Sequence, residues 1–152
     1  MKQIIHTSKA FVNSLLVLSL ILLCACGKKE DPKLPGYRDN MQAYVNDLAS
    51  LSASIDALDT SASDAPQKLL SLLDQMKEDL SGMAALEVPA DYSDAGRMAA
   101  EASTLMNDAV SLYHEAYEGA SYDAGKADQA RQQYENAMNK LGSIGSYFTG
   151  EE

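Results

Sequence analysis

The sequence predicts an all-α fold: a four-helix bundle in which consecutive helices run antiparallel, in an up-down-up-down order. Apolar residues recur at alternating spacings of three and four in four stretches, about residues 37–59, 64–86, 90–118 and 123–148. This spacing places them on one seam of each helix. Only a few residues separate the stretches, so each helix must fold back beside the one before it. A long three-helix arrangement with a loose fourth segment is the alternative.

The first residues follow a different pattern. Residues 1–9 carry Lys2 and Lys9 and no acidic residue, and the 14 residues from 10 to 23 carry no charge and are almost entirely apolar. A basic start followed by a short apolar run is typical of a signal peptide. A membrane-spanning helix needs about 20 apolar residues, so an uncleaved anchor over residues 10–26 is the less favoured interpretation.

The apolar run closes with Leu23-Cys24-Ala25-Cys26. This segment resembles the lipobox of bacterial lipoproteins, with a leucine, two small residues and the obligatory cysteine, although a cysteine is less usual than Ser, Ala or Thr at position 24. The resemblance implies a diacylglyceryl group on the Cys26 thiol, removal of residues 1–25, and a further acyl chain such as palmitate on the new N-terminus. It also implies that the protein is anchored in a bacterial cell membrane, with its ectodomain on the extracytoplasmic side.

Such processing determines the composition of the mature chain. It leaves 127 of the 152 residues, enough for one small domain, and it takes away Lys2 and Lys9, so the formal charge changes from −10 to −12. A surface this acidic excludes nucleic-acid binding through phosphate neutralisation and favours a cationic protein partner. The membrane is then held through the lipid alone. With Cys24 removed and Cys26 alkylated, no thiol remains for disulfides or metal ligation.

Residues 26–36 contain two prolines and no periodicity, which predicts a lipidated N-terminus and a flexible tether before the bundle at 37–152. Alanine is frequent in the seams of the third and fourth helices, so we expect their backbones to approach more closely than those of the first two. The predicted seams are Met41, Tyr44, Leu48, Leu51, Ile55 and Leu58; Leu69, Leu73, Met76, Leu80 and Met83; Tyr92, Ala95, Ala99, Ala102, Met106, Ala109, Tyr113 and Ala116; and Ala127, Ala130, Tyr134, Ala137, Leu141, Ile144 and Phe148.

Helix ends carry their own signals. Pro66 is tolerated in a first turn, and Pro89 ends the second helix because the residue before a proline leaves helical geometry. Four aspartates near the predicted starts are expected to cap helices rather than to act in catalysis. They are Asp39, Asp64, Asp91 and Asp123.

The search for catalytic or metal-binding motifs gives negative results. No residue set supplies a nucleophile, a base and an oxyanion donor together, so no enzyme activity is expected. We expect no metal site and no cofactor beyond the covalent lipid. His114 lies one step off the third seam and is expected to face solvent, and its spacing of four from Glu118 is explained more simply by exposed polar neighbours than by a shared metal ion.

The tyrosines suggest a binding surface. In the predicted topology Tyr113, Tyr117 and Tyr122 gather at the membrane-distal end. Tyrosines commonly close the end of a helical core, and they are also enriched at protein interfaces. Tyr117 and Tyr122 are therefore the candidate partner-binding residues.

Two classes of function follow. The first is a non-catalytic binding or accessory lipoprotein at the cell envelope, of which a protective lipoprotein that blocks a toxin or an incoming phage is a special case. The second is a ligand, metal or haem carrier that uses the bundle interior. The sequence favours the first.

Overall fold

The computed structural model describes residues 32–149, with side chains through Gly145. Four α-helices make up this part of the chain: α2 (Leu34–Asp56), α3 (Ala65–Ala84), α4 (Ser93–Tyr117) and α5 (Ala124–Thr149), with a short 3-10 helix, η1 (Ala90–Tyr92), before α4. No strand occurs within these residues. The predicted all-helical class and the four helices are confirmed. Predictions for the signal peptide and Cys26 lie outside these residues, and the prediction for Phe148 lies outside the described side chains.

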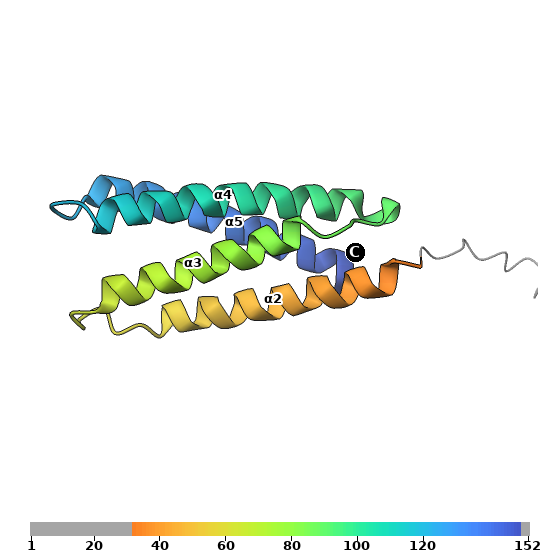
Figure 1. Cartoon of the computed structure of the whole chain (residues 1–152), viewed down its shortest axis with the longest axis horizontal. Coiled ribbons are helices and arrows are strands. Elements are labelled where there is room, and N and C mark those ends of the chain that lie inside the picture. The colour runs from red at the N-terminus through yellow and green to blue at the C-terminus, as the bar shows by residue number, and fades with distance from the viewer. Residues whose placement is uncertain (1–31, 150–152) are drawn as a thin grey trace, which may run out of the picture. The chain divides into compact units, whose positions relative to one another are not determined.

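The helices lie alongside one another (Figure 1). The α2–α3 and α4–α5 connections are at one end, and the α3–α4 connection is at the other end with the start of α2. Among the described helices, the backbones of α4 and α5 pack together most extensively, as expected from their alanine-rich seams. α2 makes little contact with α5. Among residues 32–149, no helix is both long enough and apolar enough to cross a bilayer.

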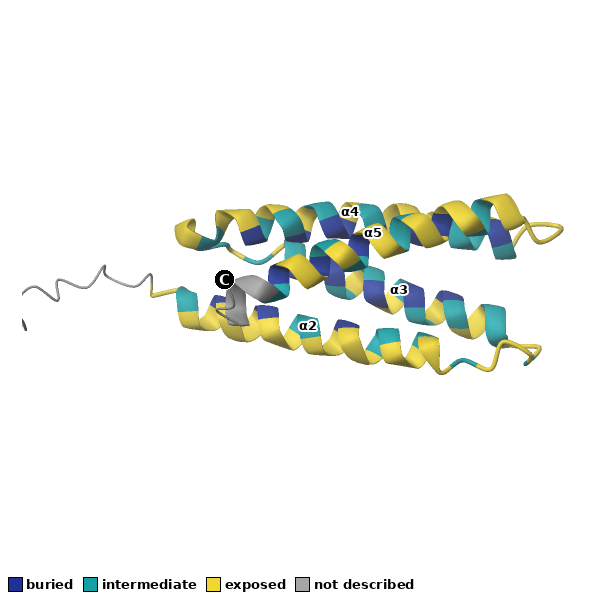
Figure 2. Ribbon diagram, turned by 180° about the vertical axis from the view of Figure 1, so that it is seen from behind, coloured by how far each residue is buried: buried dark blue, intermediate teal, exposed yellow. Residues whose placement is uncertain are grey.

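The predicted seams form most of the core. Buried positions face the inside of the helix assembly and exposed positions face outward (Figure 2). Val110 and Ser103 are also buried, although neither belongs to the predicted third seam. The apolar residues of the continuous buried cluster are Tyr37, Met41, Leu48, Leu73, Met76, Leu80, Met83, Ala99, Ala102, Met106, Val110, Ala137, Leu141 and Ile144.

The first helix begins earlier than predicted. α2 starts at Leu34, inside the segment expected to be tether, and ends at Asp56 rather than near residue 59. Pro35 lies in its first turn, where its missing N–H would have no helical partner in any case and its fixed φ suits a helix. Pro35 was thus wrongly assigned to the tether, whereas Pro32 precedes the helix. Because α2 begins before Asp39, this residue lies inside the helix and is not a cap.

Two of the predicted caps lie at helix starts. Asp123 accepts a hydrogen bond at 3.1 Å from the backbone N–H of Lys126 in the first turn of α5, as a capping side chain does. Asp64 precedes α3 but makes no side-chain capping bond; it pairs with Lys68 at 2.9 Å. Asp91 lies within η1, and the α-helix begins two residues after it.

Candidate functional site

His114 is the one histidine in the described residues, and it lies between α3 and α4. Its Nε2 is 3.1 Å from Asp74 Oδ2 on α3, and its Nδ1 is 3.1 Å from Glu118 Oε2, one turn further along the chain. Its side chain is only 31% exposed. The expectation that His114 faces solvent is therefore met only in part, because its side chain is partly exposed and also contacts α3. A position one step off the seam of α4 still lies against the neighbouring helix, and sequence spacing alone did not reveal Asp74 as its partner.

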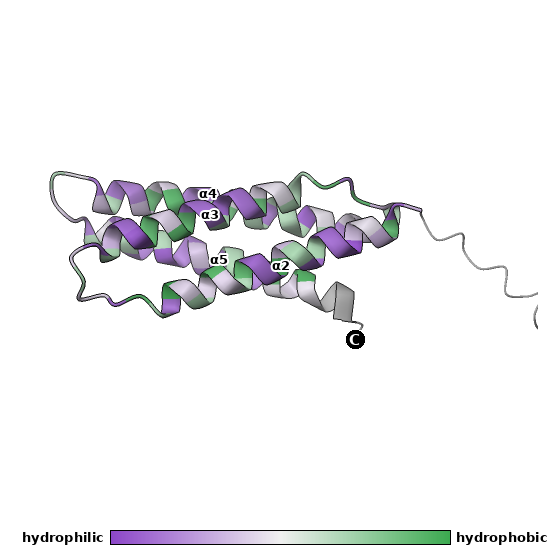
Figure 3. Ribbon diagram, turned by 60° about the horizontal axis from the view of Figure 1, so that its bottom comes forward, coloured by the Kyte–Doolittle hydropathy of each residue, from purple (hydrophilic) through white to green (hydrophobic). Residues whose placement is uncertain are grey.

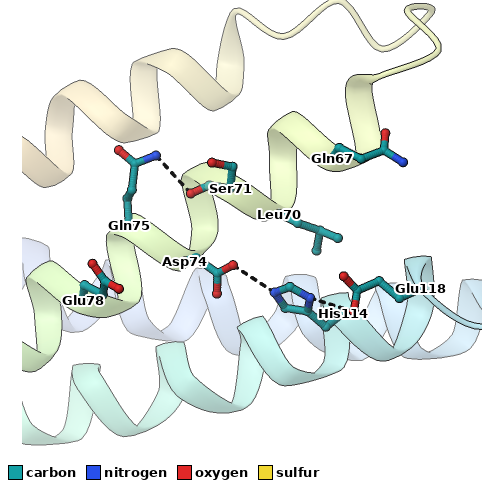
Figure 4. Close-up of a pocket in the computed structure, with 8 residues that line it drawn as sticks. All are labelled: Gln67, Leu70, Ser71, Asp74, Gln75, Glu78, His114 and Glu118. Atoms are coloured by element: carbon teal, nitrogen blue, oxygen red, sulfur yellow. Dashed lines mark hydrogen bonds and ion pairs between the residues drawn. The ribbon is translucent and has the colours of Figure 1, made fainter.

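The imidazole lies at the edge of a polar pocket of about 390 Å³ (Figure 4). Asp74 and Glu118 point toward the ring from opposite sides. Asp74 pairs with two groups, His114 and Lys77, because its other oxygen is 3.2 Å from Lys77 Nζ. The remaining lining residues are Gln67, Leu70, Ser71, Gln75 and Glu78.

The two carboxylates determine the protonation of His114. Partial burial lowers its pKa, but the hydrogen bonds to Glu118 and Asp74 and the negative charge of both outweigh this effect, so the pKa is raised above its ordinary value. A neutral imidazole has one N–H, so only the protonated ring donates to both carboxylates. With both nitrogens engaged, the ring has no nitrogen left to accept a proton from a nucleophile.

We expect the contribution of His114 to stability to depend on pH. A pKa raised in the folded state stabilises the fold fully below the unfolded-state pKa and loses that effect as the pH rises through the folded-state pKa. His114→Gln should therefore lower the free energy of unfolding by about 1 kcal/mol or less at about pH 5.5, and by less at about pH 8.5. Urea unfolding of both proteins at the two pH values measures this difference. A larger loss at the alkaline pH would contradict stabilisation of the protonated His114 ring by Asp74 and Glu118.

The second candidate site is at the end of the molecule that carries the α4–α5 connection. The ring centroids of Tyr113 and Tyr117 are 6.4 Å apart, and those of Tyr117 and Tyr122 are 5.2 Å apart. We call this group the tyrosine tip. Tyr122 is 59% exposed, the one large apolar side chain that is exposed within the described residues. The structure thus brings together Tyr117 and Tyr122, the residues singled out from the sequence.

The two inner tyrosines of the tip have altered acidity. Burial raises the pKa of Tyr113 to about 12, and the neighbouring Tyr117 adds to the shift. Burial also raises the pKa of Tyr117, with Tyr122 contributing further. The phenols of Tyr113 and Tyr117 therefore stay protonated at neutral pH and act as hydrogen-bonding, uncharged groups.

An apolar pocket adjoins the tip. It has a volume of about 170 Å³, and Tyr117 forms part of its wall. The other lining residues come from the α2–α3 connection and the start of α3: Leu58, Thr60, Ala65, Pro66 and Leu69. Sequence spacing did not reveal this pocket, because the α2–α3 connection and the start of α3 build it together with the end of α4, about fifty residues later in the chain.

Charges around the tip are predominantly negative. Glu115 pairs with Lys126 at 2.7 Å, and Glu118 pairs with His114. Asp59 accepts bonds from the backbone N–H and the hydroxyl of Ser61, and these bonds lower its pKa. An apolar pocket beside an exposed tyrosine and several carboxylates matches a ligand with an apolar anchor and positive charge.

No group of three or more His, Cys, Asp or Glu side chains within residues 32–149 is arranged to hold a metal ion. Met41, Met76, Met83 and Met106 are fully buried in the apolar core, where flexible side chains fill space.

The fold and these two sites define the class: an all-helical protein with four α-helices, a histidine held between two carboxylates, and an exposed aromatic tip. The chain matches no protein-family model, no curated protein and no solved structure.

Proposed function

We propose that this protein is a membrane-anchored lipoprotein that acts as a non-catalytic binding module at the cell envelope. The observation that carries the proposal is the tyrosine tip, where exposed Tyr122 packs on Tyr117 beside an apolar pocket. Aromatic side chains beside a pocket are the usual anchors of protein interfaces. A protective lipoprotein that blocks a toxin or an incoming phage is a narrower form of the same function.

The proposed partner is a cationic protein with an apolar or aromatic anchor. Acidic residues exceed basic ones by ten in the whole chain, and Glu115, Glu118 and Asp59 lie around the tyrosine tip. Opposite charge speeds encounter, whereas burial of the anchor determines how long the complex lasts. The acidic flanks and the apolar pocket therefore have separate roles in recognition.

We further propose that the helices form an antiparallel, up-down-up-down bundle, which makes the tip a rigid end rather than a mobile loop. Two ion pairs between α4 and α5 support this arrangement. Glu101 lies 2.6 Å from Lys140, and Glu115 lies 2.7 Å from Lys126. As residue number rises along α4 it falls along α5, as antiparallel neighbours require. Tyr117, at the end of α4, and Tyr122, in the short α4–α5 connection, are then held together at this end.

The lipoprotein part of the proposal depends on the Leu23 to Cys26 segment. We expect Cys26 to become labelled when cells grow with an alkyne fatty acid, and Cys26→Ala to abolish the label. The same substitution should move the protein from the membrane fraction to the soluble fraction, because two acyl chains are needed for stable attachment. Cys24→Ala is the matched control and should keep the label. Equal labelling of the Cys26→Ala protein would disprove lipidation.

The tip is tested by photocrosslinking in intact cells. A photoreactive phenylalanine analogue in place of Tyr122 should give one discrete adduct, and the same analogue in place of exposed Thr104, in the middle of α4, should not. With the captured partner purified, Tyr117→Ala should weaken binding by about 2 kcal/mol, or roughly thirtyfold.

Salt provides a second readout of the same interface. Affinity should fall between physiological salt and 1 M, because the screening length shortens from about 8 Å to about 3 Å. A melting temperature that stays near that of the wild type shows that the Tyr117→Ala protein is folded. Adducts of equal yield from positions 122 and 104 would place the interface elsewhere.

A further inference from the structure

The end of α4 places a titratable side chain next to the tyrosine tip. His114 is joined twice to Glu118, the first residue after α4. The backbone N–H of Glu118 donates to the His114 carbonyl at 2.9 Å, and Glu118 Oε2 lies 3.1 Å from His114 Nδ1. Tyr117 of the tip immediately precedes Glu118. The α4–α5 connection therefore begins at a residue whose side-chain contact depends on the protonation of His114.

The α4–α5 connection has little packing to hold it. Residues 118–125 are all exposed, and Tyr122 is among them. A hydrogen bond of 3.0 Å from the backbone N–H of Asp123 to the carbonyl of Ala116 ties the connection back to α4. This connection and the α2–α3 connection lie together at the left end of the molecule in Figure 3. Segments with few buried contacts open locally at low cost, so one charge interaction can change the conformation of this connection.

Two carboxylates lie at the end of α4, where the negative end of the helix dipole disfavours negative charge. Glu115 is paired with Lys126 of α5 at 2.7 Å. Glu118 forms its ion pair with His114 and no other within the described side chains. Deprotonation of His114 therefore leaves Glu118 as a carboxylate without a cation at the negative end of α4.

The other partner of His114 is affected less. Asp74 of α3 also pairs with Lys77 at 3.2 Å, so it keeps a cation when the imidazole loses its proton. Glu78 is the remaining charged residue of α3 in the pocket, farther from the ring than Asp74 (Figure 4), and the described parts of α2 and α5 add no residue to its lining. A neutral imidazole donates to one carboxylate at most. The loss of the proton therefore acts mainly on the end of α4.

We propose that His114 is a pH-dependent switch that controls the tyrosine tip through Glu118. The protonated ring holds Glu118 and keeps Tyr122 packed on Tyr117, whereas the neutral ring releases Glu118 and lets the connection carry Tyr122 away. Because the pKa of His114 is raised, the tip stays ordered to a higher pH than an ordinary histidine would allow. The conformational change needs no partner, but its effect on binding rests on the proposed function.

The switch is tested on the full chain by nuclear magnetic resonance, with tyrosine rings labelled with carbon-13, from about pH 5 to about pH 8.5. The Tyr122 resonances report its distance from the Tyr117 ring and should change with the same midpoint as the His114 imidazole. The fraction of molecules with the two rings apart should rise about two- to fivefold, the size of an exposed charge interaction at a helix end. Tyr92, before α4 at the opposite end of the molecule, should not respond. Constant Tyr122 resonances during the titration of His114 would overturn the proposal.

Two variants test the route through Glu118. Glu118→Gln and Asp74→Asn each remove one carboxylate partner of His114 and the same amount of charge. After Asp74→Asn, Tyr122 should still follow the titration of His114. After Glu118→Gln, His114 should still titrate but Tyr122 should no longer follow it. Circular dichroism checks that both variants are folded. A response that survives Glu118→Gln would overturn the proposed route.

The same pH change tests the regulation of binding. The partner crosslinked at position 122 should bind about two- to fivefold more weakly at about pH 8.5 than at about pH 5.5. Because the partner has titratable groups of its own, the ratio of the two affinities is compared with that of Glu118→Gln, which should be smaller. Failure to capture a partner would contradict the proposed function and leave the resonance measurements valid. Tip resonances that ignore pH would overturn the switch and leave the proposed function standing.

Discussion

Replacing Leu73 with alanine is expected to lower the free energy of unfolding by about 2 to 5 kcal/mol. Leu73 is 1% exposed in the middle of α3 and belongs to the continuous apolar cluster. The substitution removes buried methyl groups and leaves a cavity that helices held on several sides cannot easily close. Urea unfolding followed by far-ultraviolet circular dichroism measures the loss.

The neighbouring serine on α3 provides the control for this experiment. Ser71 is exposed, two residues before Leu73 and on the outer side of the same helix. Ser71→Ala should change the free energy of unfolding by no more than about 0.5 kcal/mol. Similar effects of the two substitutions would mean that α3 does not bury this seam against the other helices.

Gly96→Ala is expected to destabilise the fold by about 1 to 3 kcal/mol, although alanine favours helices. A Cβ at Gly96, in the first turns of α4, would lie 2.6 Å from Cγ2 of Val88 and 3.0 Å from its Cγ1. Val88 cannot easily move aside, because a β-branched side chain has few rotamers and the following residue is buried Pro89. The α3–α4 connection must therefore shift. Thermal and urea unfolding both measure the change.

Gly142→Ala is the matched control, because it makes the same substitution inside α5 where a Cβ meets nothing within 4 Å. There the helix propensity of alanine acts alone and should stabilise the protein by about 0.5 to 1 kcal/mol. Opposite signs for the two glycines are the expected result. A stabilising Gly96→Ala would show that the loop carrying Val88 adapts at no cost.

The fold class could be predicted because the apolar residues recur at regular spacings along the sequence. Leu73, Met76 and Leu80 recur at spacings that only a helix brings to one face, and these residues are buried. Local chemistry also located the start of α5, since Asp123 can satisfy an exposed backbone N–H of the first turn. The start of α2 was harder to predict, because a proline such as Pro35 is compatible both with a tether and with a first helical turn.

The candidate sites depended more on tertiary structure. Tyr117 and Tyr122 are close in sequence, so their grouping followed from the predicted connection between two helices. The pocket beside them did not, because Leu58 comes from the α2–α3 connection and Pro66 from the first turn of α3, both at least fifty residues before Tyr117. His114 was assigned to solvent because its partner Asp74 is 40 residues away.

The sequence by itself determined that four amphipathic helices form and which seam each of them buries, because helical periodicity is a property of neighbouring residues. The close packing of α4 on α5 could be expected from their alanine-rich seams, but only the tertiary structure decided that α2 and α5 make little contact and leave a groove beside Gly142. The physical reason is that the distance between two helices depends on the side chains of both at their crossing, and the sequence of one helix carries no information about which residues face it.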